Sequence, residues 1–92
     1  MKLQVDREYE GDIESVIERL HGMESRLRTR YRAETGWTNE STMSIGGPGV
    51  RGSVNVVDQT LHVELELSAV LIPLRSRIEK LLGKELDRVA VA

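Results

Sequence analysis

The stretch that decides the fold is Gly49–Leu67, GVRGSVNVVDQTLHVELEL, in which apolar and polar residues alternate on both sides of Asp58-Gln59. A period of two is typical of strands with one buried face, and a two-residue break between such strands predicts a hairpin. The predicted register pairs like with like: Val56 with Leu61, Val54 with Val63, Asn55 with His62, Ser53 with Glu64, and Arg51 with Glu66. Because Gln fits the second turn position less well than Gly, a one-residue bulge is the main alternative to this register.

Upstream of the hairpin, the period changes to that of a helix. Apolar residues recur at spacings of three and four, which predicts one buried helix face: Ile13, Val16, Ile17, Leu20, Met23, Leu27 and Tyr31. Asp12 and Glu14 suit the start of this helix, where capping oxygens and negative charge are favoured. Thr35-Gly36 is expected to end it, because glycine adopts the left-handed conformation without steric cost.

The remaining segments complete the predicted order. Residues 2–9 alternate between apolar and polar side chains and predict a short, polar edge strand, while Thr42–Ile45 predicts another strand, followed by a turn at Gly46–Gly49. Pro73 suits a helix start, since its missing N–H would be unpaired there. The second helix is expected to place Gly83 opposite its apolar stripe, which consists of Leu74, Ile78, Leu81, Leu82, Leu86 and Val89.

These patterns predict a single α+β domain over residues 1–92. Its expected architecture is a two-layer sandwich in the order strand, helix, three strands, helix. The sheet is mostly antiparallel, both helices cover one face, and the other face is open to solvent.

Composition excludes several classes of protein. The 92 residues include 13 Lys and Arg against 15 Asp and Glu, a formal net charge of −2, which argues against a generally basic nucleic-acid binder. With no cysteine, disulfides, thiolate metal sites and cysteine nucleophiles are excluded. The longest apolar run, Ala69–Ile72, is far too short for a membrane span, and the charged N-terminus does not resemble a signal peptide. We therefore expect a cytoplasmic protein.

The second half of the chain carries a resemblance to a known family. It resembles the small putative polyhydroxyalkanoic acid system proteins of bacteria. The residues that carry the resemblance are Gly49-Val50-Arg51-Gly52-Ser53-Val54, the strand Thr60–Leu67, Leu71–Glu79 and Leu86-Asp87, together with the long helix and Trp37. The resemblance covers nearly the whole chain and implies an association with polyester storage granules. It carries over no catalytic or binding motif, and Glu8–Asp12 stands where relatives usually have a histidine followed by a Ser or Thr cap.

Two sequence features have to be considered as possible anion-binding sites. Gly47–Gly52 spells G-x-G-x-x-G, but a strand rather than a helix follows it, so we interpret it as a hairpin turn and expect no dinucleotide cofactor. Arginines crowd the end of the first helix. Arg19, Arg26 and Arg30 line one flank and Arg28 and Arg32 the other, so the cluster could meet phosphates, although the helix dipole alone favours such a charge distribution.

The ionisable residues of the sheet and helices have competing interpretations. His62, with Glu64 and Glu66 on the same strand face, could form a weak metal or proton-transfer site, but a solvated sheet face has the same pattern. Glu24 and Glu85 could form an acid/base pair in a cleft. The alternative is that Glu24 leans towards Arg28 and that Glu85 lies where the last helix runs past the core. We expect no metal site.

The first functional hypothesis is a non-enzymatic accessory protein that binds a protein partner or a storage-granule surface. Its expected contact surfaces are the open sheet face and the arginine-rich helix end: Arg51, Ser53, Asn55, His62, Glu64, Glu66, Arg19, Arg26 and Arg30. A homodimer through a sheet edge or the open face would enlarge so small a core. The alternatives are a small apolar-ligand-binding protein or weak enzyme with a helix–sheet cleft, and anion or nucleic-acid binding through the arginines.

Overall fold

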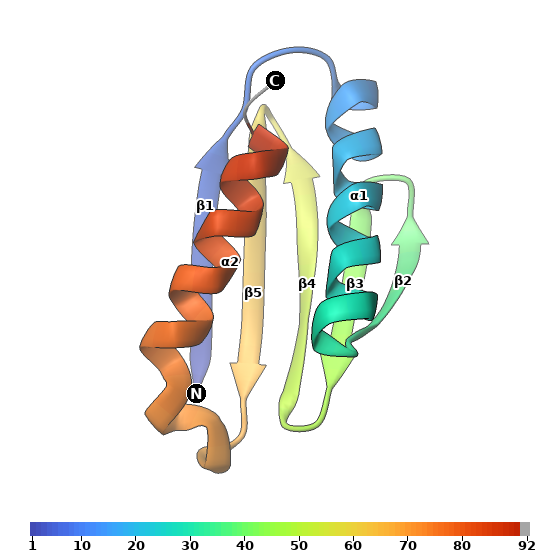
Figure 1. Cartoon of the computed structure of the whole chain (residues 1–92). Coiled ribbons are helices and arrows are strands. Elements are labelled where there is room, and N and C mark those ends of the chain that lie inside the picture. The colour runs from blue at the N-terminus through green and yellow to red at the C-terminus, as the bar shows by residue number, and fades with distance from the viewer. Residues whose placement is uncertain (91–92) are drawn as a thin grey trace.

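The computed structural model describes residues 1–90 and contains five strands, a 3₁₀ helix and two α-helices (Figure 1). In chain order these are β1 (Lys2–Glu8), α1 (Ile13–Tyr31), β2 (Glu34–Asn39), β3 (Thr42–Gly47), β4 (Val50–Val57), β5 (Thr60–Leu67), η1 (Ala69–Leu74) and α2 (Arg75–Ala90). The strands form one sheet in the order β1-β5-β4-β3-β2, and every neighbouring pair is antiparallel. The α+β class predicted from the sequence is confirmed.

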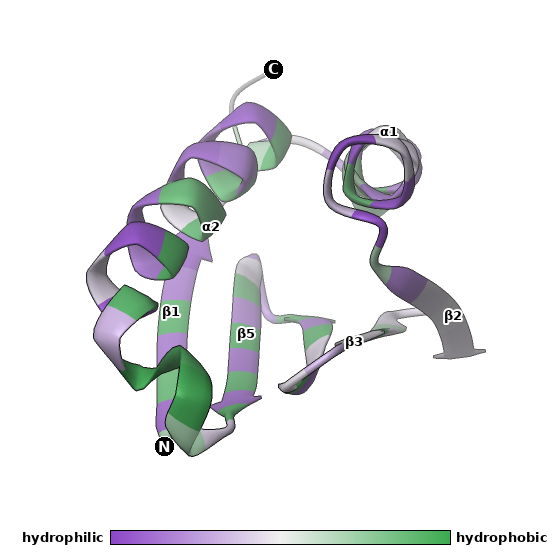
Figure 2. Cartoon of the chain, turned by 60° about the horizontal axis from the view of Figure 1, so that its bottom comes forward, coloured by the Kyte–Doolittle hydropathy of each residue, from purple (hydrophilic) through white to green (hydrophobic). Residues whose placement is uncertain are grey.

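Both helices lie on the same side of the sheet, as the end-on view of Figure 2 shows. The alternating strand residues that point towards the helices are buried, with Val54, Leu61 and Val63 fully inaccessible. They pack against the apolar stripes of α1 and α2, where Leu20, Met23, Leu86 and Val89 are also inaccessible. One core therefore lies between two layers, and the opposite sheet face carries polar side chains.

The central hairpin has the predicted register. Val56 pairs with Leu61, Val54 with Val63, and Arg51 with Glu66, and no bulge interrupts β4 and β5. Asp58 and Gln59 have φ values of 50° and 64°. Two consecutive left-handed residues form the turn whose twist matches a hairpin, so Gln59 accepts a conformation that glycine would adopt more readily.

The end of the first helix differs from the prediction. Helix α1 ends at Tyr31, and Arg32 takes the left-handed capping conformation, with φ 54° and its N–H donating to the carbonyl of Leu27. Thr35-Gly36 instead belongs to β2, an edge strand that the sequence did not reveal, so the sheet has five strands rather than four. Strand β3 also continues to Gly47, which confines the predicted Gly46–Gly49 turn to Pro48 and Gly49.

The second helix also begins and packs differently. Pro73 lies inside η1, and α2 starts at Arg75. Leu74 does not join the apolar stripe, because 44% of its surface is exposed. Gly83 was predicted to lie opposite the stripe but is buried, and a Cβ there would lie 3.0 Å from an Arg7 guanidinium nitrogen of β1. The glycine thus allows α2 to approach the edge strand.

The closest approach within the sheet occurs at Gly52 on β4. A Cβ at this position would collide with the carbonyl oxygen of Glu64 and would lie 2.9 Å from the Cα of Leu65. Both obstacles belong to the β5 backbone, so they cannot rotate away as a side chain can. Gly46 on β3 is a matched contrast, since a Cβ there meets nothing within 4 Å.

We expect Gly52→Ala to lower the free energy of unfolding by about 2 kcal/mol or more, because an added methyl group forces β4 and β5 apart. Chemical denaturation of the purified variant measures this change. Gly46→Ala is the control and should leave stability unchanged or raise it slightly, since alanine loses less backbone entropy on folding. Equal stability of the two variants would show that the Gly52 contact does not constrain the hairpin.

Candidate functional site

The predicted polar sheet face exists and is not covered by either helix. Its six predicted residues lie side by side in paired strands: Arg51, Ser53 and Asn55 on β4, and Glu66, Glu64 and His62 opposite them on β5. His62 Nδ1 lies 2.8 Å from Asp6 Oδ1 of β1, and the Thr42 hydroxyl donates to Asn55 Oδ1 at 3.0 Å. Within residues 1–90 no group of three or more His, Asp or Glu side chains is placed to hold a metal ion.

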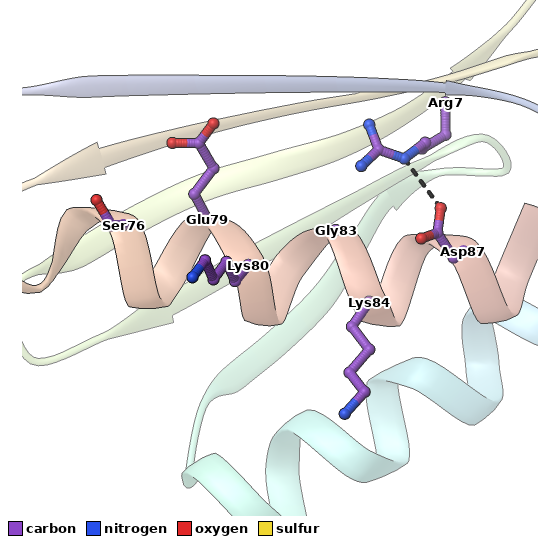
Figure 3. Close-up of a pocket in the computed structure, with 7 residues that line it drawn as sticks. All are labelled: Arg7, Ser76, Glu79, Lys80, Gly83, Lys84 and Asp87. Atoms are coloured by element: carbon purple, nitrogen blue, oxygen red, sulfur yellow. Dashed lines mark hydrogen bonds and ion pairs between the residues drawn. The ribbon is translucent and has the colours of Figure 1, made fainter.

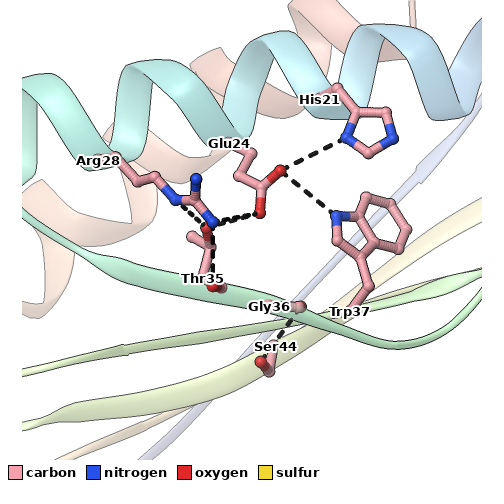
Figure 4. Close-up of polar contacts among 7 residues, drawn as sticks. All are labelled: His21, Glu24, Arg28, Thr35, Gly36, Trp37 and Ser44. Atoms are coloured by element: carbon pink, nitrogen blue, oxygen red, sulfur yellow. Dashed lines mark hydrogen bonds and ion pairs between the residues drawn. The ribbon is translucent and has the colours of Figure 1, made fainter.

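Glu24 forms the most connected polar cluster, between α1 and β2 (Figure 4). The Thr35 hydroxyl donates to Glu24 Oε2 at 2.7 Å, Arg28 Nη2 donates to the same oxygen at 3.2 Å, and Trp37 Nε1 donates to Oε1 at 3.4 Å. His21 Nδ1 lies 3.4 Å from Oε1. Glu24 is only 8% exposed. The predicted contact with Arg28 is confirmed, but β2 supplies two partners that the sequence did not indicate.

The surroundings of Glu24 favour its ionised form. Burial is the largest single influence and by itself raises the pKa, because it removes water from the charge. Hydrogen bonds from Thr35, Trp37 and His21, together with the charge of Arg28, outweigh it and hold the pKa of Glu24 below its ordinary value. Glu24 is therefore a charged anchor between helix and edge strand, and its oxygens are occupied by structural partners.

The second buried carboxylate joins the two helices. Arg26 Nε of α1 donates to Glu85 Oε2 of α2 at 2.8 Å, and Glu85 is 4% exposed. Nearby, Arg19 Nε donates to the carbonyl oxygen of Val89 at 2.6 Å. The expectation that Glu85 lies beyond the core is therefore wrong. Two of the five arginines predicted for anion binding, Arg19 and Arg26, therefore hold α1 to α2, whereas Arg30 is exposed.

A shallow groove follows the free edge of β1 beside α2 and contains charges of both signs (Figure 3). Arg7 crosses it, donating to Asp87 Oδ1 at 3.0 Å and to the carbonyl of Asp6 at 2.9 Å. Met1 and Leu67 exchange both backbone hydrogen bonds. Because hydrogen-bonded and non-hydrogen-bonded pairs alternate along antiparallel strands, the backbone N–H and C=O of Asp6 point away from β5, towards the free edge. Arg7 therefore occupies one acceptor at the sheet edge, and a homodimer through that edge stays a prediction.

An exposed apolar surface, which the sequence did not predict, lies at one end of the molecule. In η1, which follows β5 and precedes α2, Val70 is 82% exposed, Ile72 43% and Leu74 44%. We refer to these three side chains as the apolar end. The apolar run Ala69–Ile72 is too short for a membrane span, and its sequence alone does not indicate which way the side chains point. The short 3₁₀ helix turns Val70, Ile72 and Leu74 outward instead of into the core.

We expect Glu24→Gln to lower the free energy of unfolding at neutral pH by about 2 kcal/mol, because several charge-assisted hydrogen bonds are lost. Chemical denaturation measures this change.

The same substitution should change how stability depends on pH. Since the folded-state pKa is depressed, the Glu24 contribution is present above the unfolded glutamate value of about 4.3 and is lost as pH falls through the lower folded pKa. Denaturation between pH 3 and 6 should therefore show a steeper loss of stability for the original chain than for the variant.

The control for this experiment is Glu64→Gln, which removes a glutamate charge from the exposed sheet face. It should retain more of the acid-dependent loss of stability than Glu24→Gln does. Identical pH profiles for the two variants would contradict the anchoring role of Glu24.

Comparison with known proteins identifies the family but no individual relative. In the described part of the chain, no helix combines the length and the hydrophobicity needed to cross a membrane. Neither a search of curated proteins nor one of solved structures found a match. The model of one protein family, however, matches residues 3–89, which cover all of the strands and helices except the first residue of β1 and the last residue of α2. The chain belongs to the family of putative polyhydroxyalkanoic acid system proteins.

Proposed function

We propose that this protein is a non-enzymatic, cytoplasmic accessory protein of polyhydroxyalkanoate metabolism that binds the storage-granule surface through its apolar end. The observation that carries the proposal is the exposure of Val70, Ile72 and Leu74 within the six-residue η1. Family membership supplies the metabolic setting. A polyester granule offers an apolar interface that such side chains can enter.

The energetics of the apolar end support a contact role. Exposed apolar side chains are common singly, whereas neighbouring ones mark sites of protein or surface interaction. Burying one valine or leucine side chain is worth about 1.5–3 kcal/mol, so even this small group can supply useful affinity. Arg75 and Arg77 follow immediately and are exposed, which adds positive charge beside the apolar residues.

The positions of the ionisable groups favour binding over catalysis. Glu24 and Glu85 lie on different faces of the helix pair, one facing β2 and the other joining α1 to α2. They therefore do not share a cleft as an acid/base pair would. His62 pairs with Asp6 on the open sheet, where water competes for every contact.

The remaining partner hypotheses have weaker support. The polar sheet face, including Arg51, Ser53 and Glu66, is free for a protein partner but also has the composition of an ordinary solvated face. Nucleic-acid binding through the first helix is less well supported, because Arg19 and Arg26 form hydrogen bonds to α2 instead of being available for phosphates.

The test is co-sedimentation of the purified protein with isolated polyhydroxyalkanoate granules. We expect Val70→Asp to weaken binding about tenfold or more. In the complex with the granule, the variant has a charge that must be desolvated in place of an apolar side chain that becomes buried on binding. Its folding should be unaffected, since Val70 is largely exposed in the free protein.

Val57→Asp is the matched control. Val57 ends β4 and is also exposed, but it lies beside the Asp58-Gln59 turn, at the opposite end of the strand from η1 (Figure 1). This variant should bind granules as the original chain does. Equal loss of binding in both variants, or no binding by the original chain, would refute the proposal.

A further inference from the structure

An apolar groove lies between the end of α1 and the first turns of α2. It has a volume of about 220 Å³ and its floor is formed by β3, β4 and β5. Its walls are almost entirely hydrocarbon, with Leu27, Tyr31, Ile45, Leu65, Ile78 and Leu81 as the large contributors. Neither Glu24 nor Glu85 lines it, so it has no buried carboxylate to act as an acid or base.

A polar hollow adjoins this groove at the β3–β4 turn. It is lined by Arg32 and Arg51, with Glu34 as its acidic member. The groove and the hollow share Gly46, Gly47, Pro48 and Val50, so the same turn forms a wall of both. An apolar slot thus meets a region in which positive side chains outnumber negative ones.

From this juxtaposition we infer that the groove binds the hydrocarbon chain of an amphiphilic carboxylate, with the carboxylate placed near Arg32 and Arg51. The volume admits roughly seven groups of the size of a water molecule or a methylene, at about 30 Å³ each. Arginine pairs well with carboxylates because its planar donors match both oxygens. An acyl chain of about eight carbons, including the carboxyl carbon, therefore fits both parts of the site.

Gly47 controls the space in the groove. It alternates with Ile45 along β3 and pairs with Val50, so it belongs to the helix-facing side of the sheet. A Cβ at this position meets nothing within 4 Å, which leaves room for a larger side chain to enter the groove. Thr38 on β2 is a matched contrast, because it is exposed and lines neither the groove nor the hollow.

The experiment is calorimetric titration of the purified protein with straight-chain fatty acids of six to twelve carbons, below their micelle-forming concentrations. Each added methylene should strengthen binding by up to about fourfold, the value expected for full burial. The gain should stop near eight carbons, when the groove is full. Octanol should bind more weakly than octanoate because it lacks the charge that Arg32 and Arg51 attract.

Two leucine substitutions, one inside and one outside the groove, distinguish the groove from nonspecific adsorption. We expect Gly47→Leu to weaken octanoate binding at least tenfold, since the new side chain occupies the space of the acyl chain. Thr38→Leu should bind octanoate as the original chain does and retain the dependence on chain length, because its side chain lies outside both the groove and the hollow. Circular dichroism and thermal unfolding of both variants establish that each is folded before the titrations are compared.

A further substitution tests the charged part of the site. Arg32→Gln combined with Arg51→Gln should bring the affinities for octanoate and octanol closer together. No binding by the original chain, an affinity that rises smoothly through twelve carbons, or unchanged binding by Gly47→Leu would each overturn the inference. Val70→Asp should still bind octanoate, because Val70 does not line the groove, so this site and the granule contact can fail separately.

Discussion

The antiparallel contact between β4 and β5 is the interaction on which the rest of the structure depends. It places Val54 against Val63 and Arg51 against Glu66, so one face of the sheet is apolar and the other polar. A slip of one residue would reverse the faces of a whole strand. Gly52 allows the close approach of the two backbones at this pairing. Once the faces are assigned, both helices must cover the same side, because the core forms only there.

The two helices on that side of the sheet contact different strands. Helix α2 packs near β1, where buried Gly83 admits Arg7, while α1 contacts β2 through Glu24. The helices are joined by the buried contact of Arg26 with Glu85. Desolvation offsets much of the attraction in a buried ion pair, but removing one partner is costly because the other charge is left buried and uncompensated. The apolar groove lies where α1 ends and α2 begins, on the side of the helix pair nearer η1.

This arrangement separates surfaces of different chemistry on one small protein. The open sheet face is polar and its charges are solvated, whereas η1 exposes Val70 and its neighbours. The groove is apolar inside and has arginines at its margin.

The features that could be read from the sequence are those set by local periodicity. Alternation over Val50–Leu67 was sufficient for the hairpin register, because a period of two assigns every side chain to a face. Spacings of three and four likewise identified the central core positions of α1, including Leu20 and Met23, whereas Ile13 and Tyr31 at the ends of the predicted stripe are exposed. The polar residues of the sheet face followed from the same alternation.

The features that only the tertiary structure decided depend on contacts between distant segments. Strand β2 contains Gly36, a residue with weak strand preference. It is held by pairing with β3 and by the contact of Glu24 with Thr35 and Trp37. Gly83 is buried because β1 passes beside it, and Glu85 is buried because Arg26 faces it. The groove exists only where two helix ends and a turn meet. No residue pattern specifies such an encounter, because its free energy comes from the packing of segments far apart in the chain.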